Sequence, residues 1–149
     1  MTQRYIALET GEVDIAVGLT VNEVSQIADN PDLTLATSPT TVFTTLNFNC
    51  AKAPFDNEKF RQAIDYAINE EAVVQAVFRG SAQYTPGPVT PNTKYFYDGE
   101  PHCRYDVEKA KELFAESGAD MSKTYEIVTN ESQTRIDEAT IIQQQLAEA

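Results

Sequence analysis

Residues 46–80 read LNFNCAKAPFDNEKFRQAIDYAINEEAVVQAVFRG, and this stretch decides the fold. Apolar side chains recur in it at three- and four-residue spacing, which predicts one apolar stripe along a helix. The side chains of this stripe are Phe60, Ala63, Ile64, Ala67 and Ile68. Pro54 stops a strand from continuing into the helix, and Asp56 is the predicted N-cap.

A second helix is predicted directly after the first. Asn69 ends the first helix and caps the second, and Glu70 and Glu71 occupy the first turn, where the helix dipole favours acidic side chains. The apolar side of this helix consists of Val73, Val74, Val77 and Phe78. Gly80 is a typical C-terminal stop. The stretch therefore predicts two consecutive helices joined by a tight turn.

The N-terminal part predicts a helix end, a strand and a short helix. Residues 5–10 form the helix end, which closes on Gly11, and the alternating EVDIAV at 12–17 is typical of a strand with one buried face. Thr20 followed by Glu23 has the spacing of a capping box, which predicts a helix that ends before Asn30-Pro-Asp.

Further strands and helices follow in the rest of the chain. Residues 33–36, 42–48 and 125–129 are rich in strand-forming residues. Asp106 is expected to cap a helix that buries Ala110, Leu113 and Phe114 and ends at Gly118, and a last helix carries Ile136, Ala139, Ile142 and Leu146. The predicted fold class is α/β, with α+β as the alternative, and residues 1–149 form a single domain or a sub-domain fragment.

Residues 83–104 have no helical or strand periodicity. The segment contains Pro86, Pro88, Pro91 and Pro101 with aromatic residues between them. We predict a long ordered loop, because Tyr84, Tyr95, Phe96 and Tyr97 require other groups to pack against. Loops of this length inside a domain are uncommon and often functional.

Composition excludes several classes of protein. The 149 residues are 42% hydrophobic, which is typical of a globular chain, and their formal net charge is −12. This charge argues against nucleic acid or an anionic membrane as a partner. The first residues lack the pattern of a secretory signal. The chain is therefore either cytoplasmic or a piece of a longer protein, and the helical pattern that continues to its end favours the piece.

No catalytic or metal-binding motif is present in the sequence. His102 and Cys103 are adjacent, so in an extended segment their side chains point apart, and one histidine leaves a metal site short of ligands. Glu12 and Asp14 fall on the solvent face of the predicted strand. Cys50 and Cys103 are either two free thiols or one bridge. We expect no catalysis, no metal and no cofactor.

Three segments, in this order, resemble one protein family. They are ALETGEVDIAVG, then NFNCAKAPFDNEKFRQAIDYAINEEAVVQAVFRGSA, then YDVEKAKELFAESGA, and TRIDEATIIQQQLAEA resembles the helix that follows. The family is the extracellular solute-binding proteins of the dipeptide, oligopeptide and nickel class, family 5. The resemblance implies part of one lobe of a two-lobe, type II periplasmic-binding-protein-like fold, whose other lobe and main ligand anchor lie elsewhere.

The resemblance also implies a function. It implies capture of peptides or similar small solutes outside the cell for an ABC importer, with permease subunits as partners and a monomeric protein that is periplasmic or a cell-surface lipoprotein. The alternative is a solute-binding sensor domain of a transcriptional regulator or another regulatory module. An extracytoplasmic compartment permits a bridge between Cys50 and Cys103.

In the resembled fold, the segment before the Pro-Phe turn runs along the ligand cleft. The expected ligand-binding residues are Thr40, Val42, Phe43, Thr45 and Asn47. Half of these side chains would face the core if the segment is a strand. For Arg61 we expect a structural role, either beside Asp65, near the loop after Pro86, or on backbone carbonyl groups.

Overall fold

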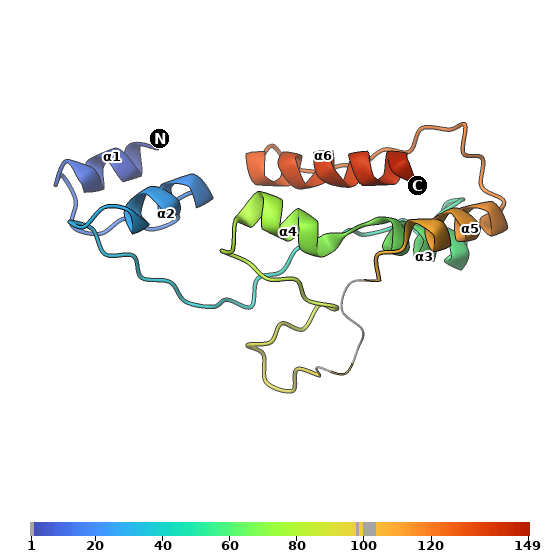
Figure 1. The fold of residues 1–149 in the computed structure, drawn as a ribbon, viewed down its shortest axis with the longest axis horizontal. Helices are drawn as coiled ribbons and strands as arrows, with labels where there is room; N and C mark the ends of the chain where they lie inside the picture. Colours follow the sequence, from blue (N-terminus) through green and yellow to red (C-terminus); the bar gives the residue numbers. More distant parts are fainter. Residues whose placement is uncertain (1, 98, 100–103) are drawn as a thin grey trace. The chain divides into compact units, whose positions relative to one another are not determined.

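The computed structural model describes residues 2–97, 99 and 104–149 (Figure 1). Its helices are α1 (Gln3–Glu9), α2 (Val21–Ala28), α3 (Glu58–Ala67), α4 (Glu70–Phe78), α5 (Val107–Ser117) and α6 (Gln133–Glu148). The chain divides into two compact units, residues 1–40 and residues 41–149. All the predicted helices are present, and each unit is described by itself below.

The prediction of an α/β fold is not confirmed, because the described residues contain helices and no strands. The segments predicted as strands, 12–17, 33–36, 42–48 and 125–129, have no regular structure. A strand needs a neighbouring strand to bond its backbone and another layer to cover its apolar face. Ile15 and Val17, predicted to be buried, have exposed fractions of 81% and 78%. No layer among the described residues therefore covers these two apolar side chains.

The first unit consists of α1 and α2 with their connection. Gly11, at φ +74°, follows α1 in a left-handed conformation that glycine adopts without strain. Tyr5 from α1 and Ile27 from α2 are the buried hydrophobic residues of this unit. The Arg4 guanidinium donates to the carbonyl groups of Val17 and Gly18, at 3.2 and 2.9 Å, and so holds the connection against α1.

Glu23 is the buried charged group of this unit. The capping box predicted at the start of α2 is present, since the Thr20 hydroxyl accepts from the Glu23 N–H and the Glu23 carboxylate accepts from the Thr20 N–H at 2.9 Å. The carboxylate also accepts from the Thr20 hydroxyl and the Thr2 N–H. Burial alone raises the pKa of Glu23, but these hydrogen bonds outweigh burial and lower the pKa to about 2.

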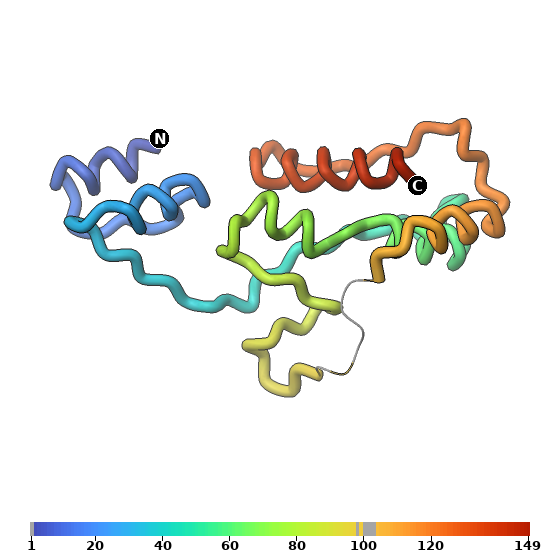
Figure 2. The backbone as a smooth tube through the Cα atoms, in the orientation of Figure 1, coloured from blue at the N-terminus to red at the C-terminus, as the bar shows by residue number. Residues whose placement is uncertain are grey.

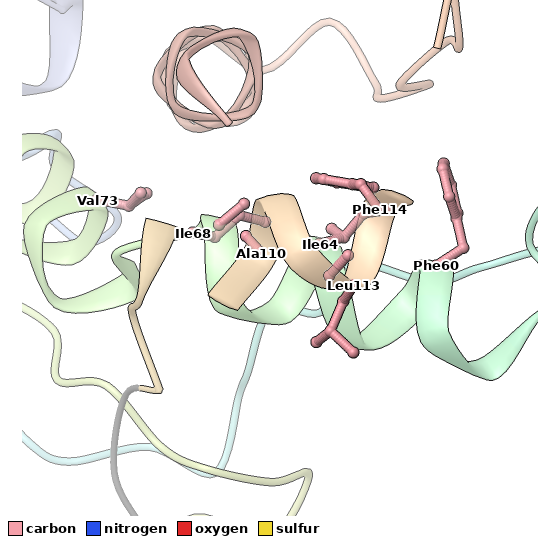
Figure 3. Packing of buried hydrophobic residues seen from close by; sticks show 9 residues of the cluster. Phe60, Ile64, Ile68, Val73, Ala110, Leu113 and Phe114 are labelled. Atoms are coloured by element: carbon pink, nitrogen blue, oxygen red, sulfur yellow. The ribbon is translucent and has the colours of Figure 1, made fainter. Parts of the chain in front are cut away.

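The second unit contains the main hydrophobic core, which lies chiefly between α3 and α5 (Figure 3). The buried residues from these helices are Phe60, Ala63, Ile64, Ala67, Ala110, Leu113 and Phe114, which includes every residue predicted to face inward on α5. Ile68 and Val73 extend the cluster to α4. The small alanine side chains allow the two helix backbones to approach closely.

The start of α3 differs by one residue from the prediction. Asn57 is the N-cap, and its side-chain carbonyl oxygen accepts from the Lys59 N–H, whereas Asp56 lies one position earlier. Adjacent Asp and Asn are both good caps, so their pattern does not distinguish them. Arg61 donates to the carbonyl groups of Phe55 and Asp56, at 2.7 and 3.0 Å, which is the structural role expected for it.

An aromatic cluster fixes the segment after α5 to the core. Tyr125 contacts Phe55 and Phe60 edge-on, with ring centroids 5.7 and 5.5 Å apart, and Phe60 contacts Phe114 at 5.4 Å. The Tyr125 hydroxyl donates to the Asp120 carbonyl group at 3.1 Å. The residue that begins the predicted strand 125–129 is therefore a packing anchor within an irregular segment.

Helix α6 packs against α4 and touches α3 (Figure 2). Asn69 caps α4 as predicted, with its side chain accepting from the Ala72 N–H at 2.9 Å. The Asn69 N–H in turn donates to the Gln145 side chain of α6 at 3.0 Å. The start of α4 is thereby bonded to α6 across 76 positions of sequence. The left-handed C-cap of α4 is Arg79, one residue before the predicted Gly80.

Candidate functional site

The predicted ligand-binding segment straddles the boundary between the two units. Thr40 is the last residue of the first unit, and Val42, Phe43, Thr45 and Asn47 belong to the second. All five are exposed and lie outside regular structure, with exposed fractions of 79% for Val42 and 44% for Phe43. Four of the five candidates therefore lie on one exposed stretch of the second unit, and their role in ligand binding stays a prediction.

Thr45 and Asn47 are hydrogen-bonded to each other. The Asn47 side-chain amide donates to the Thr45 hydroxyl oxygen at 3.0 Å. This bond uses neither the Asn47 side-chain carbonyl oxygen, which is an acceptor, nor the Thr45 hydroxyl hydrogen, which is a donor. A peptide bond offers one donor and one acceptor, so this pair of groups is suited to bind a peptide backbone.

The structure adds Arg135, which sequence reasoning missed. Its guanidinium, on the first turn of α6, donates to the Thr44 hydroxyl and forms an ion pair with Glu138 at 2.7 Å. The spacing of Arg135 and Glu138 on a helix is a signal for their ion pair. No local signal links Arg135 to Thr44, which is 91 positions away.

The proline-rich loop encloses a separate shallow hollow of about 180 Å³. Its lining residues are Pro86, Gly87, Pro88, Val89, Tyr95, Phe96 and Tyr97. The expectation that all four aromatic residues pack is wrong for Tyr95 and Tyr97, which have exposed fractions of 86% and 70%. Instead, the Lys94 ammonium lies 4.8 Å from the centre of the Tyr95 ring. Exposed rings of this kind can be held by a cation rather than by a core.

The two cysteines and the histidine are only partly described. The Cys50 thiol is exposed and lies 3.7 Å from the carbonyl oxygen of Phe48. His102 and Cys103 lie outside the described residues, so the Cys50–Cys103 bridge stays a prediction. Glu12 and Asp14 are exposed, as expected for a solvated face. Within residues 2–97, 99 and 104–149, no three acidic, cysteine or histidine side chains gather in a way that suits a metal ion.

No helix in the described part of the chain combines the length and apolarity needed to cross a membrane.

The sequence matches the family described as "Bacterial extracellular solute-binding proteins, family 5 Middle" over residues 1–149. Among curated proteins, it is 34% identical over 117 residues to heme-binding protein A of Haemophilus influenzae, covering 78% of this chain and 21% of that protein. It is 36% identical over 115 residues to the glutathione-binding protein GsiB of Salmonella typhimurium, covering 77% of this chain and 22% of that protein.

The GsiB protein of Escherichia coli K12 is similar to the chain at 35% identity over the same length. The chain thus spans about a fifth of the length of these relatives. The match to the family covers the helical pair 46–80, the segment before it and the last helix.

Proposed function

Because this chain belongs to the bacterial extracellular solute-binding proteins of family 5, we propose that it is part of the substrate-binding subunit of an ABC importer. This subunit captures peptides or similar small solutes outside the cytoplasm, as a periplasmic protein or a cell-surface lipoprotein. It delivers them to permease subunits without chemical change. The observation that carries the proposal is the family match over residues 1–149.

The exposed segment 42–47 of the second unit supports this function. Its hydroxyl and amide groups can bond a peptide backbone, and Phe43 offers an apolar ring to a side chain. GsiB is named for glutathione, which is a tripeptide, so a short peptide is the class of solute that we propose. Another relative is named heme-binding protein A, so hemin is the second solute to be tested for binding, beside short peptides.

The proposal is tested by calorimetry on the full-length protein that contains this chain. Reduced glutathione, di- and tripeptides and hemin are titrated separately, and we expect saturable binding of at least one short peptide. A ligand at a hundred times its Kd stabilises the folded protein by about 2.7 kcal/mol, so the thermal midpoint rises as well. The 149-residue chain alone is expected to bind weakly or not at all, because most of the contacts are absent.

Two results would overturn the proposal. One is the absence of binding of every peptide to the full-length protein. The other is conversion of a bound peptide to products, measured by mass spectrometry of the recovered solute.

A further inference from the structure

Residues 43–47 contain two side-chain hydrogen bonds, one within the segment and one to α6. Asn47 bonds to Thr45, two positions away, at 3.0 Å. The Thr45 and Asn47 side chains are therefore held together, and Thr44 is the chain neighbour of Thr45.

Thr44 is tethered to α6. The Arg135 guanidinium donates to the Thr44 hydroxyl, and the same nitrogen lies 2.7 Å from the Glu138 carboxylate. Glu138 is buried, with an exposed fraction of 9%, and its partner among the described residues is Arg135. A charge-assisted bond to a buried carboxylate restricts the orientation of the guanidinium, which makes Arg135 a defined attachment point for Thr44.

We propose, on the basis of the proposed function, that Arg135 is a positioning residue for the solute site. By binding Thr44 it restrains the exposed segment that carries Phe43, Thr45 and Asn47, the side chains proposed to contact a peptide solute. Glu138 orients the arginine. In this arrangement Arg135 acts through the segment and does not touch the solute.

The first measurement needs no solute. Hydrogen exchange of the amides in residues 41–47 is followed by mass spectrometry in the full-length protein for Arg135→Gln, Arg135→Lys and Thr44→Val. Loss of the tether by the first or third change is expected to speed this exchange by about tenfold. Arg135→Lys restores part of the protection because it keeps a charged donor. Exchange in α3 and α5 stays unchanged.

Arg104→Gln is the matched control. It removes an arginine from an exposed ion pair with Asp65 at 4.0 Å, in the same unit. Such a pair contributes little, so exchange in residues 41–47 should not change. If the amides of residues 41–47 exchange at the same rate in Arg135→Gln as in the wild type, Arg135 does not restrain this segment through Thr44.

The second measurement is affinity for reduced glutathione, or for whichever peptide the wild type binds. Arg135→Gln and Thr44→Val are each expected to lower the affinity about tenfold, and the double variant is expected to lose no more than either single one. A loss of affinity in Arg135→Gln with no change in exchange would overturn the positioning role in favour of direct contact. If the wild type binds no peptide, the proposed function fails, and the exchange experiment still decides whether the tether exists.

Discussion

Glu23 is a carboxylate in the interior of the first unit, where three donors compensate for its burial. An unpaired buried charge is costly, and a carboxylate that accepts several hydrogen bonds is favoured in its ionised form. The donors are the N–H groups of Thr2 and Thr20 and the Thr20 hydroxyl. A single side chain thus joins the start of α1 to the start of α2.

Glu23→Gln is expected to loosen the first unit. The amide keeps the shape of the side chain but not the charge, and it places a donor against N–H groups. The loss is about 1 kcal/mol, typical of a removed helix cap. Hydrogen exchange of the α1 and α2 amides at pH 7 measures it. The matched control is Glu108→Gln, since Glu108 forms an exposed pair with Lys111.

The stability that Glu23 contributes should depend on pH. Its pKa falls on folding from its ordinary value of 4.5 to about 2. The contribution is therefore complete above about pH 4.5 and is lost as the pH falls toward 2, because protonation then favours the unfolded chain. The difference in α2 protection between wild type and Glu23→Gln should shrink over this window. A difference that grows on acidification would contradict the assignment.

Contacts between residues close in sequence were predictable, and distant ones were not. The capping box of Thr20 and Glu23 and the cap by Asn69 follow from spacings of three residues. The bond from the Thr2 N–H to Glu23 spans 21 positions, and the bond from Arg135 to Thr44 spans 91 positions. Such meetings are set by tertiary packing, which no local pattern encodes.

At the scale of elements, α3 and α5 pack through small residues. Ala63, Ala67 and Ala110 are completely buried, with exposed fractions of 0%. The backbone N–H of Asp106 also donates to the Tyr66 carbonyl group at 2.8 Å, which fixes the start of α5 beside the end of α3. The interface therefore leaves no room for a larger side chain on α5.

Ala110→Leu is expected to destabilise the second unit by about 1–3 kcal/mol, since extra methylene groups in a packed core force side chains and backbone apart. Urea unfolding followed by circular dichroism measures the change. Ala115→Leu makes the same substitution at an exposed position of α5 and should have almost no effect. Equal destabilisation by the two variants would show that helix preference, rather than packing, is responsible.

The predicted helices are present because each carries its own signals. The apolar stripe of α3 and the Asp106 cap of α5 act within a few residues. The predicted strands needed partners, and Val128, with an exposed fraction of 89%, shows that alternation alone does not create a buried face. Apolar periodicity therefore predicted the helices correctly and the strands incorrectly.

At the scale of the whole molecule, the chain exposes an unusually large area. Its accessible surface is 10,572 Å², whereas two separate compact bodies of the sizes of the two units would expose about 8,900 Å². Exposed Ile15, Val17 and Val42 contribute to the excess. The relatives are about five times as long as this chain, so we infer that other parts of a longer protein cover these residues.

The 149-residue chain by itself is therefore expected to be less stable than the same residues within the full-length protein. Its thermal unfolding should be broad and lie at least about 3 °C lower, a shift that corresponds to about 1 kcal/mol in a chain of this size. Differential scanning calorimetry of both forms compares them. A sharp transition of the isolated chain at the same temperature would contradict the inferred covering.

The backbone bond between Asp106 and Tyr66 has a further consequence for evolution of the chain. The proline-rich loop begins after Arg79, the C-cap of α4, and it ends where the Asp106 N–H bonds to the Tyr66 carbonyl group. Neither of these anchors depends on the length of the loop. The entropy of closing a loop grows only slowly with the number of residues. Insertions near Gly87 and Pro88 should therefore lower the stability of the folded protein only slightly. The loop is thus a place where relatives can differ in length and sequence while their helices stay alike.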